Sequence, residues 1–314
     1  MTTSLLDAQG SSDSRPDAPK GAPTIPGGRR PTPRPQFDSA QLIRREDATH
    51  HVWGDREAGF VTDRVISSTG QLHCLEYEIP PRGEFRHSPT NPTIFGGDVL
   101  YFVVAGALVL ANPESGEVAR AETGEGLLFH ARTWHNGFNP YATTTRVVEF
   151  FAPPPSRGTA SDFARRQPYL DTPVYRDDRW SGRWPEAALE REQSRTLLTV
   201  GGKAGLLTFR DVSPSHIISV LVDTPYLNAS EGTIMPGHVE DFRPISNESI
   251  VVCTSGEFWV DVWDESQGYS ATSVLLPGDS MFLPRGSLER LLNRGEREAT
   301  YLRGEGSVPD GWTA

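Results

Sequence analysis

Three histidines in the first half of the chain have the spacing and surroundings of groups that do chemistry. His87 follows the segment 80–86, and His130 and His135 lie in the stretch 124–139, where a glycine turn precedes a short apolar run and a second turn. This order predicts a strand, a tight corner and a second strand that begins with an imidazole. An imidazole binds transition metals or acts as a general base near neutral pH.

The stretch 124–139 recurs at 278–293, with Glu289 in the place of His135. Other landmarks repeat at a similar interval, since His87 and His238 are 151 positions apart. One interval shared by several landmarks indicates two copies of a single structural unit.

The repeated stretches resemble the second signature of the cupin superfamily, in which glycine, proline, glycine, histidine and asparagine occur at fixed spacing. The second copy keeps the corner at Pro284 and Gly286, and the first copy keeps the histidine at His135. Looser matches to the first cupin signature occur at 80–87 and at 235–238. The resemblance is to a bicupin, and it implies an all-β fold of two tandem cupin-type jelly-roll β-barrels joined by a partly helical linker.

The succession of strand and turn signals predicts four parts of the chain. These are a disordered Pro/Gly-rich tail at 1–36, an N-terminal barrel at 37–155, a partly helical linker at 156–200 and a C-terminal barrel at 201–314. The tail has seven prolines and few apolar residues, so it has little to bury. The linker contains a helical pattern after Pro185. In the first barrel, alternation along 71–79 places His73, Leu75, Tyr77 and Ile79 on one face of a strand.

The resemblance implies a metal inside the first barrel, held by a His-x-His pair, a glutamate and the histidine of the second signature. His87 and His135 match the first and last of these ligands, whereas Pro89 and Val99 stand at the other two positions. Asp98 is adjacent to Val99, but strand alternation predicts that it faces the opposite way. The candidates to complete a metal site are Asp98, Glu149, His130 and His73. The cofactor would be divalent Fe, Mn, Ni, Cu or Zn, and the alternative is a hydrogen-bonded network without metal.

In the second barrel the matching positions hold His238, Glu240 and Glu289, and Ser249 replaces the family's glutamate. A cluster of one histidine and two carboxylates can bind a cation or work as an acid/base set. The alternative is a divergent barrel whose carboxylates pair with nearby arginines.

Composition limits the partners of the chain. The net charge of −11 and the isoelectric point near 5.2 argue against a nucleic-acid-binding surface. We expect no membrane span and no secretory leader, and we expect Cys74 and Cys253 to be buried free thiols, which together favour a cytoplasmic protein. The resemblance further implies a homodimer.

These observations predict a small-molecule enzyme that acts in the N-terminal barrel, with metal-dependent oxygenase-like chemistry as the first hypothesis. The alternative is a metal-free isomerase, dehydratase, decarboxylase or cyclase in which His87 or His135 is the general base, with His130 as a further catalytic candidate. A bicupin that binds a ligand without catalysis and a storage protein remain open as well. The substrate cannot be read from the sequence, because one fold hosts many reactions.

Overall fold

The computed structural model of the chain describes residues 33–154, 162–180, 185–210, 213–264 and 269–307. The tail expected at 1–36 lies outside these residues except for its last four positions. There, Arg34 donates a hydrogen bond of 2.7 Å to the carbonyl of Thr69, and Gln36 donates one of 3.2 Å to the carbonyl of Ser68. The described end of the tail is therefore attached to the first barrel.

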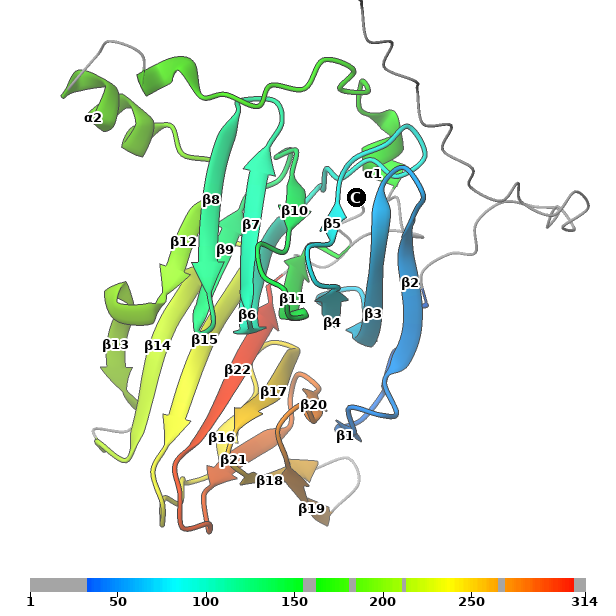
Figure 1. Cartoon of the computed structure of the whole chain (residues 1–314). Helices are drawn as coiled ribbons and strands as arrows, with labels where there is room; N and C mark the ends of the chain where they lie inside the picture. The colour runs from blue at the N-terminus through cyan, green and yellow to red at the C-terminus, as the bar shows by residue number, and fades with distance from the viewer. Residues whose placement is uncertain (1–32, 155–161, 181–184, 211–212, 265–268, 308–314) are drawn as a thin grey trace, which may run out of the picture. The chain divides into compact units, whose positions relative to one another are not determined.

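A sheet of eleven described strands curls into the nearly closed first barrel (Figure 1). Its strands are β2 (Thr49–Asp55), β3 (Gly59–Ser68), β4 (His73–Ile79), β5 (Glu84–Phe85), β6 (Asp98–Ala105), β7 (Ala107–Asn112), β8 (Glu117–Glu122), β9 (Glu125–Phe129), β10 (Asn136–Phe138), β11 (Thr145–Ala152) and β12 (Leu198–Gly201). They follow the order β12-β9-β6-β11-β4-β3-β5-β10-β7-β8, and β2 pairs with β3.

The second barrel consists of two sheets, one of seven and one of four described strands. The larger sheet has the order β1-β20-β17-β22-β15-β14-β13, from β1 (Gln41–Ile43), β20 (Ser280–Leu283), β17 (Ser249–Ser255), β22 (Ala299–Gly306), β15 (Leu227–Ile234), β14 (His216–Asp223) and β13 (Leu206–Phe209). The smaller sheet has the order β16-β21-β18-β19, from β16 (Arg243–Pro244), β21 (Leu288–Leu292), β18 (Phe258–Asp264) and β19 (Tyr269–Leu275). The all-β fold with two tandem jelly-roll barrels is thus confirmed.

Strands β4, β6 and β11 of the first barrel are buried on both faces, which explains why apolar residues dominate their sequences. On β11, Val147 and Phe151 belong to the core inside the first barrel, whereas Val148 and Phe150 belong to a second core. This second core also contains apolar side chains of β15, β17, β20 and β22, so the two barrels share it. Glu149 lies two positions from Val147 and from Phe151, so it shares their face of the strand and points into the barrel interior.

The predicted faces of β4 and β6 are confirmed. Leu75, Tyr77 and Ile79 pack in the interior of the first barrel, and so does Val99 on β6. Cys74, on the opposite face of β4, is buried without a disulfide, and so is Cys253, as the sequence predicts.

The two halves of the chain exchange edge strands. β1, near the start of the chain, pairs antiparallel with β20 of the second barrel, from Gln41 opposite Phe282 to Ile43 opposite Ser280. β12, which falls in the stretch expected as linker, pairs antiparallel with β9 of the first barrel. Each exchanged strand covers an edge that would otherwise expose unpaired backbone groups.

The connection between the barrels is partly helical, as expected. Its described helices are α1 (Asp162–Arg166), η1 (Asp178–Trp180), α2 (Glu186–Gln193) and η2 (Gly202–Ala204). Pro185 immediately precedes α2, where its missing N–H is not needed by the helix.

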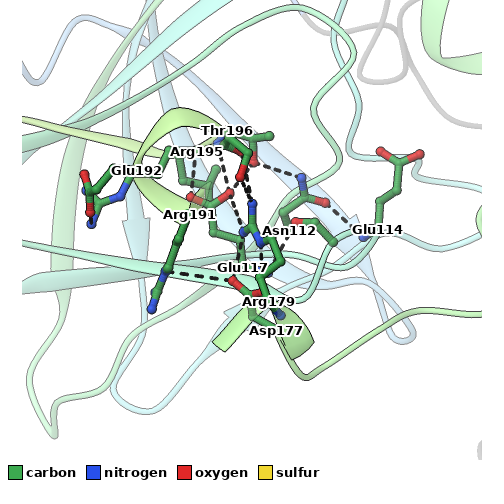
Figure 2. A network of polar contacts seen from close by, with 12 residues as sticks. Asn112, Glu114, Glu117, Asp177, Arg179, Arg191, Glu192, Arg195 and Thr196 are labelled. Atoms are coloured by element: carbon green, nitrogen blue, oxygen red, sulfur yellow. Dashed lines mark hydrogen bonds and ion pairs between the residues drawn. The ribbon is translucent and has the colours of Figure 1, made fainter. Parts of the chain in front are cut away.

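A buried carboxylate at the start of β8 fastens this connection to the first barrel (Figure 2). Glu117 accepts hydrogen bonds from the backbone N–H of Thr196 at 2.9 Å and from its hydroxyl at 2.7 Å. The guanidinium of Arg179 lies 3.9 Å from the same carboxylate and forms a closer ion pair with Asp177 at 2.8 Å. Glu117 is only 2% exposed, so these partners replace the water that it loses on burial.

We expect Glu117→Gln to lower the free energy of unfolding by about 1–3 kcal/mol, because a buried amide replaces a carboxylate that accepts charge-assisted hydrogen bonds. Urea denaturation measures the change. The matched control is Glu192→Gln on α2, whose 60% exposed side chain pairs with Arg195. Loss of this exposed ion pair should cost under ~0.5 kcal/mol. Equal effects of the two substitutions would contradict this role of Glu117.

Candidate functional site

A cavity of about 90 Å³ lies inside the first barrel. Its polar lining residues come from four strands, from the segment between β5 and β6, and from the turn before β10. The lining consists of Trp53, Val61, Asp63, His73, Leu75, Tyr77, Phe85, Thr93, Phe95, Tyr101, His135, Glu149 and Phe151. An aromatic, largely apolar wall with a few convergent polar groups is typical of a small-molecule site.

Glu149 is the most unusual group in this cavity. Its side chain is buried, and no hydrogen bond or ion pair from the described part of the chain reaches its carboxyl group. Burial, and secondarily the negative charge of Asp63, raises the pKa of Glu149 to about 8. The carboxyl group is therefore mostly protonated at neutral pH and can donate a proton.

His135 shares the cavity as a neutral imidazole. Its Nδ1–H donates to the carbonyl of Thr133 at 3.2 Å, which leaves the Nε2 lone pair to accept the hydroxyl of Tyr101 at 3.2 Å. Burial lowers the pKa of His135 to about 4, against a small opposing effect of the Thr133 hydrogen bond. The aromatic rings of Phe85, Phe95, Tyr101 and Phe129 surround the imidazole.

Two further lining residues carry buried polar atoms without a partner, His73 at Nδ1 and Tyr77 at its hydroxyl. Burial, and secondarily the charges of Arg34 and His51, lowers the pKa of His73 to about 3, so this imidazole is also neutral. Buried polar groups are normally paired, so these atoms point to a ligand that supplies their partners. The sequence motifs did not single out Tyr77 or Asp63, although the alternation along β4 places Tyr77 on the same face as His73.

The structure places His87 in the barrel wall and not among the residues that line the cavity. Its Nε2 lies 3.0 Å from the carbonyl of Leu170, and its Nδ1 lies 3.2 Å from the side chain of Asn136. The imidazole packs against the rings of Trp134 and Tyr169. Each ring nitrogen of His87 thus faces an oxygen atom, and His87 is not among the residues that line the cavity with His135.

Asp98 and His130 form a separate pair. The carboxylate of Asp98 lies 2.9 Å from Nδ1 of His130, whose side chain is 57% exposed. Strand alternation turns Asp98 away from Val99 and the interior, as the sequence predicts. The four residues proposed as metal ligands in the first barrel, His87, His135, Asp98 and Glu149, are thus distributed over three places.

In the second barrel, the structure brings together His238 and Glu240, and it adds His216 of β14, which the sequence motifs did not indicate. Donor atoms of these three buried residues lie within 4.8 Å of one another. His216 Nδ1 is 2.5 Å from Glu240 Oε1. Burial lowers the pKa of His216, whereas the hydrogen bond from His216 and the charge of Arg210 overcome burial and lower the pKa of Glu240.

Glu289 belongs to a different contact. One carboxylate oxygen pairs with Arg303 at 2.5 Å, and the other pairs with Arg210 at 3.2 Å. Burial works to raise the pKa of Glu289, but these two guanidinium groups outweigh it and lower the pKa. Its side chain therefore forms ion pairs with two arginines and does not join His238.

Equivalent asparagines give the register between the two barrels. Asn139 donates to the carbonyls of Ile79 and Thr143, and Asn293 donates to those of Ile234 and Arg297. The offset between the two asparagines is 154 positions, so the same interior positions hold two different pairs of side chains. The pairs are His135 with Glu149 in the first barrel, and Glu289 with Arg303 in the second.

The two asparagines also show which residues of the first signature are equivalent in the two barrels. The backbone N–H of Asn139 donates to Gly83, and that of Asn293 donates to His238. His238 therefore occupies the position of Gly83, four residues before His87. The spacing of 151 positions between His87 and His238 does not reflect a structural equivalence.

No helix in the described part of the chain is both long and apolar enough to cross a membrane.

Comparison of the sequence with protein-family models finds no match, and comparison with curated proteins finds none either. Comparison with solved structures finds many similar folds. A putative glyoxylate induced protein from Pseudomonas aeruginosa aligns with a TM-score of 0.60 and 14% identity, over 94% of this chain and 96% of that chain. Oxalate decarboxylase from Lactobacillus farciminis aligns with a TM-score of 0.59 and 13% identity, over 88% of each chain.

AerE from Microcystis aeruginosa aligns with a TM-score of 0.55 and 10% identity, over 82% of this chain and 97% of that chain. These neighbours have the cupin fold with two barrels. The chain therefore has the fold of a bicupin, with two cupin-type jelly-roll barrels in tandem.

Proposed function

We propose that the chain is a small-molecule enzyme whose first barrel catalyses a metal-free proton transfer, such as isomerisation, dehydration, decarboxylation or cyclisation. The observation that carries this proposal is Glu149, a carboxyl group in an apolar cavity that has no hydrogen-bond or ion-pair partner among the described residues and has a pKa of about 8. A general acid or base works best when its pKa lies near the working pH. The fold neighbours include oxalate decarboxylases from two bacteria, and the fold is found in both enzymes and globulins.

We propose the following roles for the side chains of the cavity. Glu149 donates its proton to a substrate atom, and the resulting carboxylate takes a proton back from the substrate or from solvent. The neutral His135 accepts a hydrogen bond and holds the hydroxyl of Tyr101 in one orientation. His73 and Tyr77 bind polar atoms of the substrate. Drug-sized ligands occupy pockets of ~300–1,000 Å³, so a cavity of about 90 Å³ favours a much smaller substrate.

Metal-dependent oxygenase chemistry, the first hypothesis from the sequence, has less support from the geometry of the first barrel. A metal site needs several donor atoms that converge within bonding reach. Nε2 of His87 faces Leu170, and Asp98 faces His130. The metal-free alternative uses groups that do share one cavity.

A cytoplasmic homodimer stays a prediction from the sequence, and light scattering on the purified chain tests the dimer.

We expect the wild-type chain to catalyse solvent deuterium incorporation or loss of carbon dioxide with a member of a panel of small carbonyl compounds and carboxylic acids. Proton NMR in deuterated buffer detects both. Glu149→Gln should lower the rate by ~10²–10⁴-fold, because the amide cannot transfer the proton. The matched control Glu122→Gln changes a half-exposed glutamate on β8, outside the cavity, and should keep the wild-type rate.

The pH profile adds a second criterion to this experiment. Since the pKa of Glu149 is raised to about 8, the proton needed for catalysis is present below that pH and is lost as the pH rises through it. The wild-type rate should therefore fall on the alkaline side. Oxygen consumption that requires added iron would instead support the oxygenase, and binding without turnover would support a ligand-binding role.

We expect Val61→Phe to abolish turnover by at least ~100-fold while the chain stays folded, because the larger ring fills the cavity that Val61 lines. Overpacking of this kind costs ~1–3 kcal/mol, which thermal unfolding measures. The control Val52→Phe lies on the neighbouring strand β2, where the side chain is 56% exposed. Wild-type turnover in a folded Val61→Phe variant would place the reaction outside this cavity.

A further inference from the structure

Three side chains at one end of the second barrel provide a separate site. His216 begins β14, and His238 and Glu240 lie in the turn and extended segment between β15 and β16. All three are buried, with exposed fractions of 0%, 7% and 3%. Within the described residues they form the one group of three histidine, cysteine or carboxylate side chains whose donor atoms lie within 4.8 Å of one another.

His238 presents an unused donor atom to this group. Its Nδ1 lies 2.7 Å from the hydroxyl of Ser215, and when Nδ1–H donates to that oxygen, Nε2 carries a lone pair. Nε2 is buried without a hydrogen-bond partner and lies 3.7 Å from Glu240 Oε1. A buried lone pair that faces a carboxylate at this distance lacks a cation or a proton donor between them.

His216 has a matching arrangement. Its Nε2 lies 2.9 Å from the hydroxyl oxygen of Tyr301. Its Nδ1–H donates to Glu240 Oε1, 2.5 Å away. Binding of an ion would release this proton and leave Nε2–H to donate to the hydroxyl oxygen of Tyr301. A metal-binding histidine typically donates its other ring N–H to an oxygen in this way. Ser215 and Tyr301 thus orient the two imidazoles.

We propose that His216 Nδ1, His238 Nε2 and the carboxylate of Glu240 bind one divalent transition metal ion of the zinc class. Two imidazoles and a carboxylate are a common ligand set for such ions and leave coordination positions for water or a further ligand. A surface pocket lined by Ser213, Ser215, Gly237, His238, Val239, Glu240 and Asp241 opens onto the site and gives an ion access from solvent.

Arg210 limits the affinity of this site. Its Nε lies 3.2 Å from Glu240 Oε1, the same oxygen that faces the histidines. A bound ion would replace this contact, while Arg210 keeps its second ion pair with Glu289 through Nη2 at 3.2 Å. The site also differs from the one that the sequence spacing suggested, because Glu289 is held by arginines and His216 replaces it.

The test uses the full chain after dialysis against a chelator, with Zn²⁺ in calorimetry and Co²⁺ in visible absorption spectroscopy. We expect one ion per chain and a cobalt spectrum typical of nitrogen and oxygen ligands. His238→Ala should weaken binding by at least ~100-fold, since it removes a ligand. Ser215→Ala removes only the partner of His238 and should weaken binding by ~10–100-fold.

The matched control is His50→Ala, which removes an exposed histidine of the first half and should leave binding unchanged. Circular dichroism checks that each variant is folded, and Ser215→Ala keeps the test valid if His238→Ala does not fold. Absence of stoichiometric binding to the wild-type chain, or equal binding by Ser215→Ala and the wild type, would overturn the proposal. The test measures metal binding alone, so its result does not depend on whether the first barrel is catalytically active.

Discussion

The cost of placing a charged group in an apolar barrel governs the chemistry of this chain. A buried carboxylate must either find cations and hydrogen-bond donors or take up a proton. Glu117 has such partners in Thr196 and Arg179, and Glu76 has them in Arg45 and Arg146. Glu149 has no such partners in the part of the chain that the structure describes, and burial raises its pKa until the neutral acid is the stable form at neutral pH. The proposed activity of the first barrel depends on this difference.

The two barrels place different side chains at equivalent interior positions. In the second barrel, Arg303 stands where the first has Glu149, and Glu289 stands where the first has His135. These two side chains form a buried ion pair in which the opposite charges neutralise each other. Such a pair holds a structure in one arrangement, although it adds little net stability compared with apolar packing. The first barrel keeps an open cavity with groups that can change protonation, and the second keeps a stable interior with its histidines near one end.

Much of the fold could be predicted from the sequence. Alternation along β4 correctly placed Leu75, Tyr77 and Ile79 inside, and the duplicated glycine and asparagine landmarks correctly indicated two barrels. Asp98 was correctly expected to face away from Val99. These successes concern patterns within one strand or repeated along the chain, where the period of the side chains carries the information.

Contacts between distant segments could not be predicted in this way. The exchange of β1 and β12 between the barrels depends on which edges are free in the folded chain. The engagement of His87 depends on a carbonyl at Leu170, in a segment without a motif. The predicted equivalence of His238 with His87 was wrong. His238 is equivalent to Gly83, because the two copies of the first signature are not separated by the same interval as their histidines. His216 was missed because strand β14 carries no signature, and its role follows only from the proximity of Glu240.

The most direct test of the central claim is the titration of Glu149 itself, by ¹³C NMR of a chain with labelled glutamate carboxyl groups. The carboxyl signal that is absent from the Glu149→Gln variant identifies this residue. The account predicts that this signal titrates with a midpoint near pH 8. A midpoint near the ordinary glutamate value of 4.5 would show that the group is ionised at neutral pH, and it would contradict the proposed mechanism.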